Sequence, residues 1–135
     1  MGEVLNEKRK YRRAYFSLEE STSADVFHVR NDSKPVHVQL LSIGAGGISF
    51  YGNQFKLPGV KEGDRLILKD IRAPFPLGII ENIEVEVKYI LDEVNSVCTA
   101  YGCQFINLPD EPNRRIEIFI DEQFRRNGMD GNLLE

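Results

Sequence analysis

Residues 83–105 read IEVEVKYILDEVNSVCTAYGCQF and show the clearest pattern in the chain. Apolar and polar residues alternate at first, and the apolar set comprises Ile83, Val85, Val87, Tyr89 and Leu91. Turn-forming residues follow at 92–96, and a second alternating set comprises Val97, Thr99, Tyr101, Cys103 and Phe105. Successive side chains on a strand point to opposite faces, so each set predicts a half-buried strand. The stretch therefore predicts an antiparallel hairpin with one face toward a core.

Further strands are predicted upstream of this hairpin, at 14–18, 25–29, 36–41, 48–51 and 65–68. The glycine-rich residues 42–47 connect two of them as a turn between paired strands. A helix-start pattern at 109–112 and apolar residues at helical spacing then predict a helix over 110–127. Six or seven short antiparallel strands and one amphipathic helix predict an all-β fold. It is a small closed barrel or a sandwich, with the helix packed on its surface or plugging one end.

Composition excludes several classes of protein. The 135 residues, 41% hydrophobic and 28% charged, suffice for one globular domain. No apolar run approaches the ~18 residues of a membrane span, and no secretory leader is visible, so we expect a cytoplasmic protein without membrane insertion.

The cysteines and histidines show no pattern typical of a disulfide or a metal site. Cys98 and Cys103 stand at odd spacing on a predicted strand, so we expect their side chains to face opposite ways and to form no disulfide with each other. His28 and His37 lack ligand-spaced partners, which argues against a metal site.

Catalytic motifs are equally absent from the sequence. We find no nucleophile elbow, no serine, histidine and aspartate in triad order, and no phosphate loop of the Walker kind. We therefore expect no enzyme, no catalytic residues and no cofactor.

The segment Glu7-Lys8-Arg9-Lys10-Tyr11-Arg12-Arg13 concentrates positive charge ahead of the first strand. Residues 1–13 hold five cations and two acids, a net charge of +3, so the other 122 residues carry −7 of the overall −4. Like charges packed together repel, so the cluster needs an explanation. It is either a solvated, frayed terminus or an anion-binding clamp.

Three motifs in order resemble the PilZ domains, a bacterial family of six-stranded barrels that bind cyclic di-GMP. The family's Arg-x-x-x-Arg motif is similar to Arg9 through Arg13, and its Asp/Asn-x-Ser-x-x-Gly motif to residues 42–47. A Tyr-Gly-x-x-Phe strand at 101–105 and the terminal helix complete the likeness. The resemblance covers residues 7–127: the basic segment 7–13, a barrel at 14–107 and the helix at 110–127. Residues 1–6 and 128–135 are expected to be a loose terminus and a tail.

The second motif departs from the family pattern. In the register that keeps Gly47, Ser42 replaces the Asp/Asn and Gly44 replaces the Ser. The other register keeps Ser42 as the motif serine but puts Leu40 at the acidic position, so we take the first. Losing a charged hydrogen-bond acceptor at a cost of about 1–2 kcal/mol would weaken binding roughly five- to thirtyfold.

The resemblance implies a cyclic di-GMP receptor that passes its signal to an unidentified downstream protein. Arg9 and Arg13 would grip the phosphates and stack on the purines, while Lys8 and Arg12 raise the local positive potential. Ser42, Gly44 and Gly47 would supply the turn side of the site. The alternative is a degenerate PilZ module that acts only through protein contacts. Nucleic-acid binding is disfavoured by the net −7 on the rest of the chain.

Overall fold

The computed structural model describes residues 13–16, 22–28, 35–53, 59–74, 76–92 and 98–126. The expected loose terminus at 1–6, residues 7–12 of the basic segment and the tail at 128–135 lie outside the described residues.

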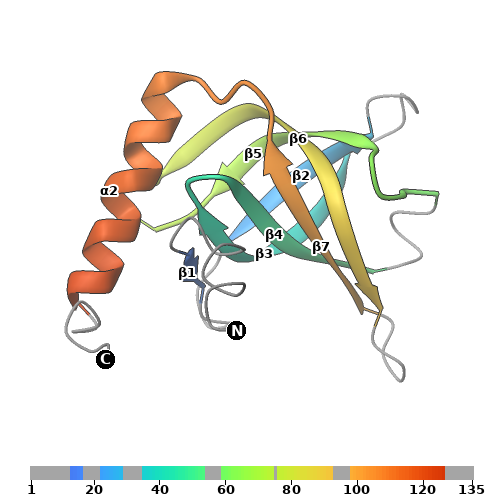
Figure 1. Ribbon diagram of the computed structural model, residues 1–135, viewed down its shortest axis with the longest axis horizontal. Helices are drawn as coiled ribbons and strands as arrows, with labels where there is room; N and C mark the ends of the chain where they lie inside the picture. Colours follow the sequence, from blue (N-terminus) through green and yellow to red (C-terminus); the bar gives the residue numbers. More distant parts are fainter. Residues whose placement is uncertain are drawn as a thin grey trace, which may run out of the picture.

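Six antiparallel strands close into a barrel in the order β3-β2-β5-β6-β7-β4, and β4 pairs back to β3 (Figure 1). Their bounds are Ser23–His28 (β2), Val36–Gly44 (β3), Gly47–Asn53 (β4), Arg65–Arg72 (β5), Ile79–Asp92 (β6) and Cys98–Phe105 (β7). A short additional strand, β1 (Arg13–Tyr15), pairs with the end of β3, and the helix α2 (Asp110–Arg126) follows the barrel. The predicted all-β barrel with a C-terminal helix is confirmed, and the sandwich alternative is excluded.

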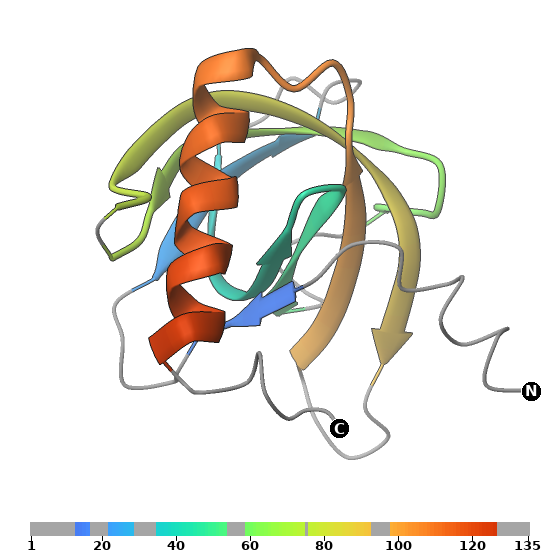
Figure 2. The same ribbon diagram turned by 60° about the vertical axis from the view of Figure 1, so that its left-hand side comes forward.

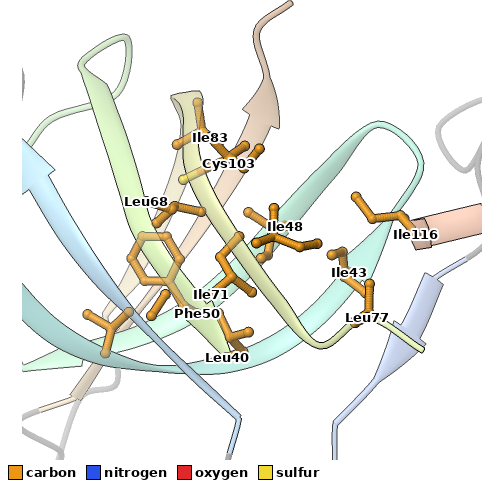
Figure 3. Close-up of a cluster of buried hydrophobic side chains, with 14 of the residues drawn as sticks. Leu40, Ile43, Ile48, Phe50, Leu68, Ile71, Leu77, Ile83, Cys103 and Ile116 are labelled. Atoms are coloured by element: carbon orange, nitrogen blue, oxygen red, sulfur yellow. The ribbon is translucent and has the colours of Figure 1, made fainter. Parts of the chain in front are cut away.

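The barrel encloses one hydrophobic core. Each strand from β2 to β7 contributes buried side chains, and the largest fully buried ones include Leu40, Ile43, Ile48, Phe50, Leu66, Leu68, Ile71, Ile80 and Ile83. Figure 3 shows side chains from different strands meeting in this core, with Ile116 of α2 reaching in beside Ile43 and Ile48. Burial of this apolar surface is the main force that holds the sheet closed.

A β-bulge in β6 overturns part of the alternation predicted for that strand. Ile83, Val85 and Val87 face the core as expected. Tyr89 and Leu91 do not, because their side chains remain 37% and 58% exposed. The register with β7 shifts between Val87 and Tyr89, which inserts one extra residue and reverses the faces beyond it. The prediction that these two residues face the core was therefore wrong.

Helix α2 packs its apolar stripe onto the barrel beside β1 (Figures 1 and 2). Ile116, Phe119 and Ile120 are buried, and the Phe119 ring stacks on Phe16 with centroids 5.6 Å apart. Acids in its first turn, at 110 and 111, and arginines in its last turn, at 125 and 126, match the helix dipole. The apolar face of α2 is therefore part of the core, as the sequence predicted.

Arg115 ties α2 to the β5–β6 connection. Its Nη1 donates to the carbonyl oxygens of Leu77 at 2.8 Å and Ile79 at 3.0 Å. Its Nε and Nη2 donate to the two carboxylate oxygens of Glu111 at 2.8 and 2.9 Å. The Arg115 hydrogen bonds lower the pKa of Glu111, and the same bonds raise the pKa of Arg115. A planar guanidinium is needed to serve both carbonyls and the carboxylate at once.

We expect Arg115→Lys to destabilise the fold by about 1–2 kcal/mol, because an ammonium group cannot satisfy both carbonyls and the carboxylate fork. Urea unfolding of this variant beside Arg114→Lys, its exposed neighbour, measures the difference. Equal midpoints for the two variants would contradict this role of Arg115.

The Glu111–Arg115 pair contributes stability above the unfolded-state pKa of Glu111, and this stability is lost as pH falls through the lowered folded-state pKa of Glu111.

Candidate functional site

A hollow of about 440 Å³ lies where the β3–β4 turn meets β6, β7 and the start of α2. In the strand run β1-β3-β4-β7-β6, Arg13 and the turn at 44–47 form the wall on the β1 side, and Lys88 and Tyr89 form the wall on the β6 side. Gln104 of β7 lines the hollow between them, paired with Gly47. Leu108 and Asn113 line its end toward α2. Its volume is in the range of small-molecule sites in proteins. Polar and apolar groups both reach the hollow, which suits a ligand with rings and charges.

Strand β1 brings Arg13, the last residue of the basic segment, to this hollow. Arg13 pairs directly with Gly44, and Tyr15 with Ser42, in the antiparallel β1–β3 ladder. Cross-strand partners point to the same face, so the Arg13 side chain projects beside the glycine turn. It is exposed and forms no ion pair with any residue of the described ranges. Arg13 and Gly44, 31 positions apart in the sequence, thus meet at one rim.

The glycine turn is shaped by close backbone approach. Strand β3 ends at Gly44 and β4 begins at Gly47, which leaves only two connecting residues. The Phe105 N–H donates to the Gly46 carbonyl at 3.0 Å and holds the turn against β7. A side-chain carbon at Gly47 would overlap the Cys103 carbonyl oxygen. Glycine is therefore required at 47 by packing.

Ser42 does not line the hollow. Its side chain is 1% exposed, and its Oγ is 2.6 Å from the Ser49 Oγ. A register shift in β3 between Leu40 and Ser42 puts Ser42 on the face of Tyr15, away from the core face of Leu40. Of the residues predicted for the site, Arg13, Gly44 and Gly47 line the hollow. Lys8, Arg9 and Arg12 lie outside the described residues.

The second wall was missed by the sequence analysis. The alternation already places Lys88 on the outer face, but the bulge in β6 turns Tyr89 outward beside it, and a bulge of this kind has no local sequence signature here. Lys88 Nζ lies 3.4 Å from the Glu86 carboxylate, an exposed pair that holds it weakly. Gly102 was the available signal, because a glycine inside a strand often marks close approach of another group.

The thiol and the histidines of the described region show no arrangement for catalysis or metal binding. Burial raises the pKa of Cys103 to about 12, so its thiol stays protonated and unreactive. His28 Nε2 lies 2.9 Å from Asp64, and His37 Nδ1 lies 3.0 Å from Asp25. No group of three or more potential metal ligands occurs among the described residues. In the same part of the chain, no helix has the length and apolar character to cross a bilayer.

Solved structures share this architecture, although no family model and no curated protein matches the sequence. The PilZ domain with c-di-GMP of YcgR from Escherichia coli is similar at TM-score 0.68 and 16% identity, over 94% of this chain and 99% of that domain. The K. pneumonia MrkH–c-di-GMP complex is similar at TM-score 0.71 and 16% identity, over 90% of this chain and 55% of MrkH. The Bacillus subtilis inhibitor of motility MotI is similar at TM-score 0.68 and 16% identity, over 92% of this chain and 53% of MotI.

The chain therefore has the PilZ fold, which confirms the resemblance noted in the sequence at the level of the fold. It spans nearly all of the E. coli PilZ domain but about half the length of MrkH and MotI.

We expect Gly47→Ala to destabilise the protein by about 1–3 kcal/mol, because β4 must move away from the Cys103 carbonyl to admit the methyl group. Gln104→Ala is the matched control, since Gln104 is the exposed cross-strand partner of Gly47 and should change stability by less than about 0.5 kcal/mol. Urea unfolding of both variants tests this. If Gly47→Ala unfolds at the wild-type midpoint, close approach does not shape the turn.

Proposed function

We propose that the chain is a cyclic di-GMP receptor domain that binds the dinucleotide in the hollow and signals to a downstream protein. One observation carries the proposal: Arg13, the last residue of the basic segment, pairs with Gly44 and borders the same hollow as the glycine turn. Arg13 of the first motif therefore adjoins Gly44 and Gly47 of the second.

The chemistry of the rim suits a cyclic dinucleotide with two phosphates and two purines. The Arg13 guanidinium can donate a planar fork of hydrogen bonds to phosphate oxygens or stack on a base. Gly44 and Gly47 leave backbone open to the ligand, and the Gln104 and Asn113 amides can pair with guanine edges. The Ser42 hydroxyl can exchange its hydrogen bond with Ser49 for one to a guanine N–H.

Lys8, Arg9 and Arg12 are proposed to complete the basic side of the site. Arg12 immediately precedes β1, and Arg9 lies four residues before Arg13, within roughly 14 Å of extended chain. The E. coli domain and MrkH were both solved with c-di-GMP, and their fold is the fold of this chain. That likeness supports the choice of ligand.

Arg13→Ala is expected to weaken cyclic di-GMP binding about tenfold or more, because a charge-assisted contact to phosphate is lost. Arg72→Ala is the matched control, since Arg72 is an exposed arginine away from the hollow and should bind like wild type. Isothermal titration calorimetry measures both, and the wild-type unfolding midpoint should rise with ligand. The proposal fails if folded wild-type protein gives no heat at high micromolar ligand, or if the two variants bind alike.

A second candidate function is protein contact without nucleotide. The position that the family fills with Asp or Asn holds Ser42, which is buried and bonded to Ser49. A hydroxyl that already bonds to Ser49 can form only a weaker hydrogen bond to guanine than a free carboxylate would. On this reading the barrel binds its partner equally well with or without cyclic di-GMP.

The double variant Ser42→Asp/Gly44→Ser separates the two functions. For a nucleotide receptor we expect cyclic di-GMP affinity to rise about fivefold or more, because a carboxylate accepts stronger hydrogen bonds from guanine. Calorimetry gives the affinity, and thermal unfolding checks that the carboxylate is tolerated. If the folded variant gains nothing over wild type, the turn does not contact guanine and the protein-contact function is favoured.

A further inference from the structure

The bulge in β6 brings the Tyr89 side chain, which a regular strand would turn into the core, to the hollow beside Lys88. In the β6–β7 ladder Val87 pairs with Cys103 and Tyr89 with Gly102, so Lys88 is the extra residue. Both Lys88 and Tyr89 are exposed and line the hollow. Bulges are frequent beside binding sites because they redirect side chains.

Backbone hydrogen bonds hold the strand firmly just before the bulge. The Val87 N–H donates to the Asp64 carbonyl at 2.8 Å, and the Gly63 N–H donates to the Val87 carbonyl at 2.7 Å. The Asp64 carboxylate accepts from the Lys61 N–H at 3.0 Å and lies 2.9 Å from His28 Nε2. Lys88 and the redirected Tyr89 therefore follow a fixed backbone, as a binding element requires.

The Tyr89 ring lies directly over Gly102. A side-chain carbon built at Gly102 would overlap the Cζ, Cε1 and Cε2 atoms of that ring. Only glycine at 102 lets the ring lie against the strand, so one of its faces is supported by backbone. Tyr101 and Phe50, the aromatic pair inside the barrel, are 3% and 0% exposed, whereas Tyr89 keeps an open surface on the hollow. Tyr89 thus has the placement of a platform for another flat ring.

We infer that Lys88 and Tyr89 form the second half of the binding site, in which Tyr89 stacks on a purine and Lys88 contacts a phosphate. The inference rests on the proposed function, because it assigns residues to the same ligand. Arg13 on β1 and Lys88 on β6 then place one cation on each wall of the hollow. Lys88 can leave Glu86 at little cost, since their 3.4 Å contact is exposed.

Two substitutions at 89 separate stacking from bulk. Tyr89→Leu keeps an apolar side chain over Gly102 but removes the aromatic face, and we expect cyclic di-GMP affinity to fall roughly five- to hundredfold. Tyr89→Phe keeps the ring and should bind within about twofold of wild type. Leu91→Ala is the control, because Leu91 is exposed on the same strand and does not line the hollow.

Lys88→Met removes the charge and should weaken binding roughly three- to tenfold, whereas Lys88→Arg should retain affinity. Lys69→Met is its control, since Lys69 is an exposed lysine of β5 outside the hollow. Gly102→Ala, which displaces the Tyr89 ring, should reproduce the loss seen with Tyr89→Leu. Calorimetry gives each affinity, and thermal unfolding without ligand confirms that each variant is folded.

The outcomes distinguish this inference from the proposed function. If folded wild-type protein does not bind cyclic di-GMP, the proposed function falls, and the assignment of this wall falls with it. If wild type binds and either Tyr89→Leu or Lys88→Met binds as tightly, the proposed function stands and the inference is overturned. Loss in both variants, with retention in Tyr89→Phe and Lys88→Arg, supports it.

Discussion

Strand β3 pairs with three other strands, and this shared ladder governs both the barrel and the hollow. One edge binds β2 along Val36–Gln39 and β1 along Ser42–Gly44, while the other edge binds β4 and closes the barrel. An extended strand has only two hydrogen-bonding edges, so β1 can pair only where β2 has left. The end of β3 therefore receives a new strand beside the glycine turn, and that strand begins with Arg13.

Two bulges determine which side chains enter the core and which lie on the outer face of the barrel. In β3 the extra residue falls between Leu40 and Ser42, and in β6 between Val87 and Tyr89. Each bulge leaves apolar side chains in the barrel on one side and redirects the next residues to the outer face. The β3 bulge buries a serine hydroxyl against Ser49, whereas the β6 bulge exposes an aromatic ring.

Most of the fold followed from periodicity, because alternation and helical spacing reflect which side chains must leave water. The hairpin at 83–105 lies where the sequence placed it, and the helix predicted at 110–127 is observed at Asp110–Arg126. The connection predicted at 42–47 joins the expected strands but is shorter, because β3 continues to Gly44 and β4 begins at Gly47. Periodicity did not predict which side chains face the core beyond each bulge, because one inserted residue moves every later side chain to the opposite face of the sheet. Tyr89 was thus expected in the core and lines the hollow. The resemblance to the family placed Ser42 at the ligand, but its side chain is buried and does not line the hollow.

The positions of Ser42 and Tyr89 are related through the sheet. Tyr15, Ser42, Ser49, Gly102 and Tyr89 are successive cross-strand partners, so they form one row across β1, β3, β4, β7 and β6. Two small hydroxyls and a glycine make the middle of this row low, and aromatic side chains stand at both ends. A charged carboxylate at 42 would need a partner in place of the neutral Ser49 hydroxyl, because an unpaired buried charge is strongly unfavourable. The Ser42–Ser49 hydrogen bond avoids that cost without a charged partner, so the open side chains of this row are the two tyrosines at its ends, Tyr15 and Tyr89.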